Sequence, residues 1–312
     1  MKKNFSMLIA LLVALSASGQ GWGQSTSSIE DLSNLRGSEP PMMGIRWARG
    51  FNPNFLASRV RAARPRKSPN MTWHGGKIMT AAVTENIFWG TSWATYSGDE
   101  IVGLDDWYQG FSNSHYAATS DEYTGTNGKV GPAIAHTGHV IDLTAASGGN
   151  KTSAILAEVC KEVTPDPSGN GYYAVYTDLP RGSSGYCAWH SYGSCGGTPV
   201  QFAFFWKLDG DPGCDPLDTS GVHTEGLAAL ANVSGHELSE ARTDPRSTGW
   251  YDSSGAENGD KCAWTFNVPL VTFTSTSGGS QWKIQGEWSN AASNAGTGYP
   301  TSGGLRGCID GH

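Results

Sequence analysis

Runs of β-branched and aromatic residues, which suit the pleated surface of a sheet, predict the strands of this chain. These runs lie at residues 77–89, 140–143, 172–176, 200–206, 269–274 and 281–285. The runs at 172–176 and 200–206 are the strongest, and the segment 186–190 lies between them. The chain is therefore expected to contribute strands at intervals from residue 77 to residue 285.

Apolar residues three or four positions apart predict three helices, at residues 99–114, 152–163 and 220–242. The apolar stripe of the third helix consists of Leu227, Leu230, Ala231, Leu238 and Ala241. This stripe is expected to face the core, and the polar residues at positions 236, 237 and 240 lie mostly outside it. Pro245 is expected to end the helix, because the residue before a proline disfavours the α conformation.

The order of these elements predicts an α/β or α+β fold in which helices pack on a mixed β-sheet. We expect one disulfide-stabilised globular domain over residues 71–312, with the helix at 220–242 under the sheet as a zincin-like active-site helix. Metallopeptidase domains share this layering, although layering alone does not determine function. Residues 20–70 are expected to be mostly irregular and to act as a basic linker or pro-segment.

The first residues are typical of a secretory signal peptide over residues 1–19. Lys2 and Lys3 precede an apolar run at 7–15 that is too short for a permanent transmembrane helix, and Ala17-Ser18-Gly19 suits cleavage. No later segment is long and apolar enough to span a membrane. The sequence therefore predicts a secreted protein, extracellular or periplasmic.

The six cysteines support export, because an even number in an exported chain indicates disulfides. They are Cys160, Cys187, Cys195, Cys214, Cys262 and Cys308. Spacing suggests a local bridge between Cys187 and Cys195, and a bridge from Cys214 to Cys262 would tie the two ends of the third helix. Three bridges allow 15 connectivities, so both pairings are hypotheses.

Charge is unevenly distributed along the chain. Residues 1–70 hold 10 of the 21 Lys and Arg residues and three acids, whereas residues 71–312 hold 11 basic and 25 acidic residues, a net charge of −14. An acidic body argues against nucleic acid or an anionic membrane as a partner and is compatible with divalent cations. The basic stretch 59–67 is typical of a linker or a cleavable arm.

The third predicted helix carries the motif H-E-x-x-E at His236, Glu237 and Glu240. Residues four positions apart lie on one helical face, so His236 and Glu240 can reach the same metal ion. Glu237 lies beside them, where a general base acting on water belongs. On a surface helix, however, the same residues would be an ordinary solvated face.

Further ligands follow the helix. Glu257, 21 residues after His236, is the expected third ligand, and Asp260 and Asp244 are alternatives. A second histidine could come from His190 or His74. One nitrogen and two oxygens suit zinc less well than two histidines would, and calcium or manganese would also accept them.

Other chemistries have weaker signals. Cys195 beside His190 resembles a cysteine nucleophile, but a disulfide is the better explanation in an exported chain. No G-x-S-x-G motif is present. Asp105 and Asp106 are adjacent on a predicted helix and cannot face each other as a glycosidase pair would, so a helix N-terminal charge explains them better.

Four segments resemble one family. They are W-H-G-G-K-I-M at 73–79, F-W-G at 88–90, G-Y-C-A-W-H at 185–190, and the run 236–262 with H-E-L-x-E, T-D-P, G-W and E-x-x-D-x-C. In this order they are similar to the phosphate-induced protein 1 family, the EXORDIUM-like proteins, and to its microbial branch, over about residues 71–265. The resemblance implies an exported protein without a defined biochemical activity. Plant members generally lack the intact H-E-x-x-E, so their role in growth does not transfer.

Two functions are therefore expected. The first is a secreted metal-dependent hydrolase, a zinc metallopeptidase in which His236, Glu240 and Glu257 hold the metal and Glu237 is the base. The second is a non-catalytic extracellular protein that binds wall polysaccharide and holds a structural cation. The partners would be an extracellular peptide or protein in the first case and a cell-wall polysaccharide in the second.

Overall fold

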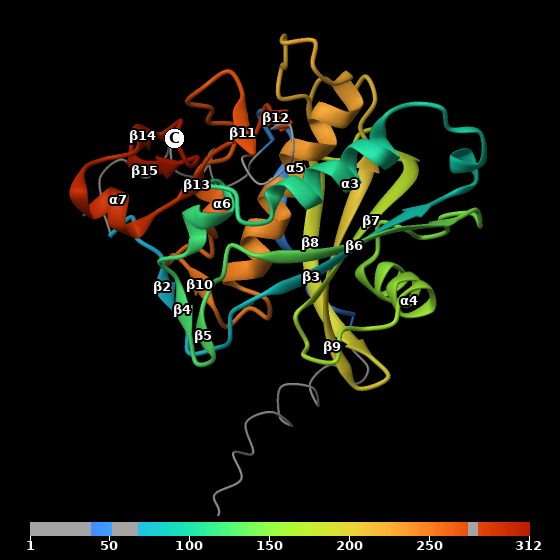
Figure 1. Cartoon of the computed structure of the whole chain (residues 1–312), viewed down its shortest axis with the longest axis horizontal. Coiled ribbons are helices and arrows are strands. Elements are labelled where there is room, and N and C mark those ends of the chain that lie inside the picture. The colour runs from blue at the N-terminus through green and yellow to red at the C-terminus, as the bar shows by residue number, and fades with distance from the viewer. Residues whose placement is uncertain (1–38, 52–67, 274–279) are drawn as a thin grey trace, which may run out of the picture. The chain divides into compact units, whose positions relative to one another are not determined.

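The centre of the fold is a mixed six-stranded sheet in the order β1-β8-β9-β7-β3-β6 (Figure 1). The computed structural model describes residues 39–51, 68–273 and 280–312. In sheet order the strands are Met43–Trp47, Tyr186–Cys195, Thr198–Lys207, Gly171–Pro180, Ala82–Trp89 and Ile134–Asp142. Strands β9, β7, β3 and β6 are parallel, whereas β8 is antiparallel to β9 and β1 is antiparallel to β8. The fold is therefore α+β with a mixed sheet.

Helices cover both faces of this sheet. The α-helices among the described residues are α3 (Glu100–Phe111), α4 (Thr152–Glu162), α5 (Glu225–Thr243), α6 (Asn258–Lys261) and α7 (Asn290–Ala295). Strand β8 turns His190 toward α5 and Gly193 toward Leu156 of α4. Because residues an odd number apart point to opposite faces of a strand, α4 and α5 lie on opposite sides of the sheet, as Figure 1 also shows.

Smaller elements complete the chain. Two-stranded pairs are formed by β2 (Thr72–Trp73) with β10 (Trp250–Tyr251), β4 (Thr124–Gly125) with β5 (Gly128–Lys129), and β11 (Val271–Phe273) with β12 (Ser280–Trp282). A three-stranded sheet contains β13 (Glu287–Trp288), β15 (Arg306–Ile309) and β14 (Tyr299–Pro300), and the 3-10 helices are η1 (Thr91–Thr95) and η2 (Ala117–Ser120). None of the helices in the described ranges has the length and hydrophobicity needed to cross a bilayer.

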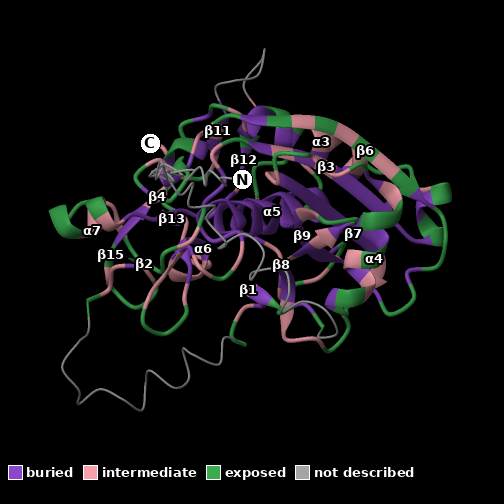
Figure 2. Ribbon diagram, turned by 90° about the horizontal axis from the view of Figure 1, so that it is seen from below, coloured by how far each residue is buried: buried purple, intermediate pink, exposed green. Residues whose placement is uncertain are grey.

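Of the helices that the structure describes, α5 is the most buried, and two expectations about it are corrected. It begins at Glu225 rather than near residue 220, because the Thr224 hydroxyl caps it by accepting from the Leu227 N–H. Every residue from Gly226 to Thr243 is buried, so α5 has no polar outer face (purple in Figure 2). The reason is that α5 packs against the sheet, α3, α6 and β12 at once.

The segment predicted as an irregular linker, residues 20–70, contains an ordered strand. Within its described residues, Met43–Trp47 form β1 at the edge of the main sheet. The domain therefore starts before Met71, and this boundary of the prediction is wrong. The apolar residues of Met43–Trp47 form too short a run to be recognised as a strand within a basic segment. The predicted signal peptide at 1–19 and the basic stretch 59–67 lie outside the described residues.

Three disulfides join the cysteines, and both predicted pairings are wrong. The bonds are Cys160–Cys195, Cys187–Cys214 and Cys262–Cys308. Cys187 and Cys195 lie at the two ends of strand β8, about 26 Å apart at about 3.3 Å per residue, which no disulfide can span. The bridges instead tie α4 to β8, β8 to the loop after β9, and α6 to β15.

Candidate metal centre

Helix α5 brings His236 and Glu240 together one turn apart. The Nε2 atom of His236 lies 3.2 Å from Oε1 of Glu240. Asp260 Oδ1 lies 3.8 Å from the same nitrogen, and the Asp260 backbone N–H donates to Glu240 Oε1 at 2.7 Å. His236, Glu240 and Asp260 thus offer three atoms that can hold one ion.

Short helix α6 sets the position of Asp260. Glu257 and Asp260 form a capping box, in which each side chain bonds the other's backbone N–H. Gly259 lets α6 approach α5 closely, since a Cβ there would lie 2.8 Å from His236 Nδ1 and 2.9 Å from Glu240 Oε1. The acidic run after α5 is therefore folded back onto the H-E-x-x-E helix.

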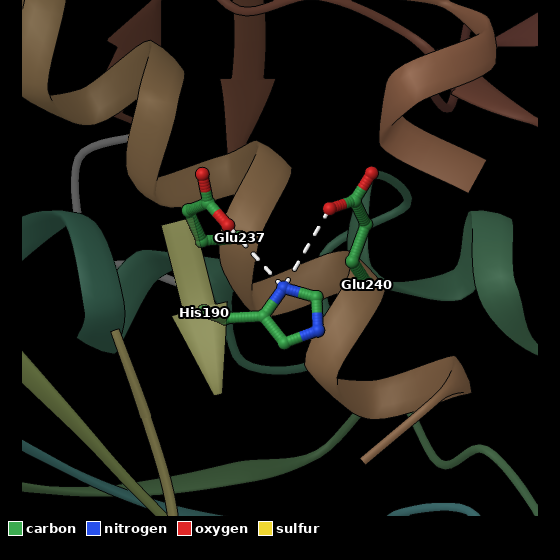
Figure 3. Close-up of side chains that lie close together, drawn as sticks. All are labelled: His190, Glu237 and Glu240. Atoms are coloured by element: carbon green, nitrogen blue, oxygen red, sulfur yellow. Dashed lines mark hydrogen bonds and ion pairs between the residues drawn. The ribbon is translucent and has the colours of Figure 1, made fainter. Parts of the chain in front are cut away.

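A second group lies on the sheet side of α5 (Figure 3). His190 Nδ1, from β8, is 3.3 Å from Glu237 Oε2 and 3.6 Å from Glu240 Oε2. The other nitrogen of His190, Nε2, lies 3.5 Å from Glu257 Oε2. Glu240 thus belongs to both groups and presents a different oxygen to each.

Gln285 contacts the Nδ1 side of the His236 ring, away from the nitrogen that faces Glu240. Its Nε2 lies 3.2 Å from His236 Nδ1 and donates to the Gly259 carbonyl at 2.8 Å. In this orientation the amide N–H faces Nδ1. For Nε2 of His236 to bind a metal, the ring proton must sit on Nδ1, where Gln285 Oε1 would accept it after a rotation of the amide that gives up the bond to Gly259. Gln285 Oε1 is buried and has no hydrogen-bond partner within the described part of the chain.

Burial determines the protonation of the centre. It lowers the pKa of His190 to about 3 and that of His236 well below its usual value, so both rings are neutral and have a lone pair for a metal. Burial and neighbouring acids raise the pKa values of Glu237 and Glu240 well above normal. A bound cation would replace the protons that these carboxyls otherwise keep.

Several atoms of the centre lack hydrogen-bond partners among the residues that the structure describes. They are His190 Nε2, His236 Nε2, Glu237 Oε1, Glu240 Oε2 and Glu257 Oε2. Buried polar atoms are nearly always paired, because leaving them unpaired is costly. Two ligands of a tetrahedral zinc ion lie about 3.3 Å apart, which matches the shortest separations in both groups. The residues therefore fit a divalent cation.

The structure separates the predicted ligands. Asp260 joins His236 and Glu240, whereas Glu257 approaches His190 and lies beside Asp244, whose charge adds to burial in raising the Glu257 pKa.

Asp244 itself accepts from the Gly249 N–H at 2.6 Å and closes the turn after α5. His74 stacks on Tyr251, with ring centroids 3.5 Å apart, and belongs to neither group. Of the two candidate histidines, the structure therefore brings only His190 to the centre.

Two residues near the centre were not predicted. Gln285 is a neutral residue at the end of a predicted strand and gave no signal. Arg46 lay inside the predicted linker, yet it is fully buried, and its charge acts on Glu237, Glu240 and Asp260. Only the placement of β1 against α5 reveals it.

A third acidic group contains a lysine. Asp142, Glu158 and Glu162 lie close together on β6 and α4. The ammonium of Lys161 lies 2.5 Å from Asp142 and 2.9 Å from Glu162, and it already supplies the positive charge there.

Comparisons of the chain with protein-family models, with curated proteins and with solved structures gave no match. The resemblance to the phosphate-induced protein 1 family therefore stays a prediction.

Proposed function

We propose that the protein is a secreted metal-dependent hydrolase that cleaves peptide bonds, with its centre on helix α5. The main support is that His236, Glu240 and Asp260 converge, while Glu237 keeps a carboxylate oxygen without a hydrogen-bond partner in the described part of the chain. One nitrogen and two oxygens suit zinc, and calcium would also accept them. The three disulfides favour export.

A zinc ion held by these three side chains would polarise the substrate carbonyl and lower the pKa of a water molecule. Glu237 would take a proton from that water while the water oxygen forms a bond to the carbonyl carbon. The C–N bond would then break, and Glu237 would return the proton to the leaving nitrogen, giving a carboxylic acid and an amine. Burial raises the pKa of Glu237, which helps this carboxyl to hold the proton between the two transfers.

His190 would position this base. Its Nδ1 lies 3.3 Å from Glu237 Oε2, which leaves Oε1 for the proton. This arrangement favours the His236, Glu240 and Asp260 group as the zinc site, because Glu237 would be a ligand if the ion lay in the other group.

Elemental analysis of the purified protein together with the substitution Glu237→Gln tests the proposal. The wild type should contain about one zinc per chain and hydrolyse a broad mixture of peptides. Glu237→Gln should keep its zinc and lose activity by about 100-fold or more. Unchanged activity in Glu237→Gln, or a metal-free and inactive wild type, would refute the hydrolase.

The burial of the centre favours a second candidate, a non-catalytic extracellular protein with a structural cation. The side chains of His190, Glu237 and Glu240 are 1%, 0% and 0% exposed, so no substrate reaches them in this conformation. In that case chelation should lower the melting temperature, and the protein should bind peptide or wall polysaccharide without turnover. Turnover that depends on Glu237 would exclude this candidate.

A further inference from the structure

Strand β1 covers the candidate metal centre. It pairs with β8 so that Met43 lies opposite His190, and Figure 2 shows the two strands side by side. The backbone of Gly44 adopts φ +47, and a Cβ at this position would overlap Glu240 Oε2 and His190 Nδ1. The main chain of β1 therefore lies directly on two residues of the centre, and only glycine fits there.

The pairing between β1 and β8 is irregular at the same place. Between the pairs Met43–His190 and Arg46–Ala188, β1 has one residue more than β8, which is a β-bulge. The bulge contains Gly44, whose backbone lies against Glu240 of α5. The regular pairing of β1 with β8 is thus interrupted at the place where β1 contacts the metal centre.

Arg46, two residues after Gly44, carries a positive charge into this region. Its side chain is fully buried, and Trp264 covers it with a ring centroid 3.8 Å from the guanidinium carbon. Its three nitrogens have no hydrogen-bond partner among the described residues. Glu237, Glu240, Asp260 and Glu287 are the acids whose charges act on it. Burial lowers the pKa of Arg46 to about 10, so these acids offset only part of the cost of burying its charge.

No covalent bond other than the chain itself holds β1 in place. All six cysteines lie at residue 160 or later, and the three disulfides join them to one another. The strand is at the sheet edge, where an extended peptide can be added or removed. After cleavage of the chain behind residue 51, β1 would be a separate peptide.

We propose that β1 occupies the place of the substrate. Once β1 has left, the edge of β8 that it covered binds an extended peptide with glycine over Glu240 and an arginine two residues later. This inference rests on the proposed hydrolase: its substrates would be peptides with glycine and arginine two residues apart, and its inhibitor would be β1. With β1 in place the centre is closed. When β1 leaves, a peptide of the same pattern pairs with β8, and its backbone reaches Glu237.

Peptide exchange tests the docking without relying on catalysis. A recognition sequence for a specific protease is inserted into the full chain between residues 51 and 68, and the chain is cut. A fluorescent peptide of residues 39–51 should then bind, as measured by anisotropy. Peptides with Gly44→Val or Arg46→Leu should bind about tenfold more weakly or worse. Phe51→Ala is the control, since Phe51 is 55% exposed and its loss should change affinity by about twofold at most.

Activity assays separate this inference from the hydrolase itself. Cut protein should cleave glycine-x-arginine peptides faster than uncut protein does, and the 39–51 peptide should compete with these substrates. Equal activity before and after cutting would refute closure by β1 and leave the hydrolase standing. Failure of the labelled peptide to exchange would show that β1 is a permanent strand. Equal binding of Gly44→Val would refute the requirement for glycine over Glu240. Binding without turnover would refute the hydrolase and leave the docking edge standing.

Discussion

Glu240 Oε1 lies 3.2 Å from Nε2 of His236, the residue one helical turn before it. The other oxygen of Glu240 faces His190 at 3.6 Å, so one carboxylate joins the helix motif to the sheet. The glutamate that replaces the second histidine of H-E-x-x-H therefore has a geometric use. Its two carboxylate oxygens face two different histidines, whereas one nitrogen of an imidazole ring could face only one of them.

The choice between Asp260 and Glu257 as third ligand is directly testable. Because Asp260 groups with His236 and Glu240, Asp260→Asn should weaken zinc binding by more than the about 10–100-fold that loss of an outer-shell partner costs. Glu257→Gln is the matched control and should weaken it less. Competition with a chromogenic chelator measures both affinities. A larger loss in Glu257→Gln would assign the ion to a site near His190.

Gln285 should control how strongly His236 binds the metal. Its amide nitrogen lies 3.2 Å from His236 Nδ1, and after rotation of the amide its oxygen would accept from Nδ1–H and fix the ring tautomer that leaves Nε2 free. Gln285→Leu should therefore lower zinc affinity by about 10–100-fold, and Gln285→Glu should restore part of it. Titration calorimetry compares the three proteins. Equal affinity of the leucine variant would mean that Nε2 of His236 is not a ligand.

The stability of the chelated protein should fall as the pH rises. Burial raises the pKa of Asp260 to about 7, above the unfolded value of about 3.9. Such a carboxyl stabilises the fold below its unfolded pKa, and this contribution is lost as the pH rises through its folded pKa. The pKa values of Glu237 and Glu240 are raised in the same direction.

Melting curves between about pH 5 and pH 8, with zinc or with a chelator, test this dependence. Zinc replaces the protons, so the melting temperature of the loaded protein should fall less and the gap between the two forms should widen with pH. A gap that stays constant or narrows would mean that these carboxyls do not bind the cation.

Local patterns in the sequence predicted most of the secondary structure. The helices at 99–114 and 152–163 match α3 and α4 closely, and the strong runs at 172–176 and 200–206 match β7 and β9. These elements have enough apolar residues at regular spacing to be recognised alone. His236, Glu237 and Glu240 were found in the same way, because one helix carries all three.

Long-range contacts were beyond the reach of such patterns. The full burial of α5 depends on α3, α6 and β12 packing around it, which its own apolar stripe does not encode. The approach of Asp260 depends on a four-residue helix with a capping box. Strand β1 depends on β8, which was itself not predicted as a strand, so Gly44 and Arg46 appeared only as part of a linker.

Removal of single disulfides should separate stability from metal binding. The Cys262–Cys308 bond anchors the end of α6, the helix that carries Asp260, whereas Cys160–Cys195 ties α4 to β8 on the opposite face of the sheet. Replacing either pair by serine should cost about 2–5 kcal/mol of stability. Only the Cys262→Ser, Cys308→Ser protein should also lose zinc affinity, because α6 can then move away from His236. Urea unfolding and chelator competition on both variants measure the two effects, with the Cys160→Ser, Cys195→Ser protein as control. If both variants bind zinc as tightly as the wild type, the Cys262–Cys308 bond is not needed to hold Asp260 beside His236, and this prediction is wrong.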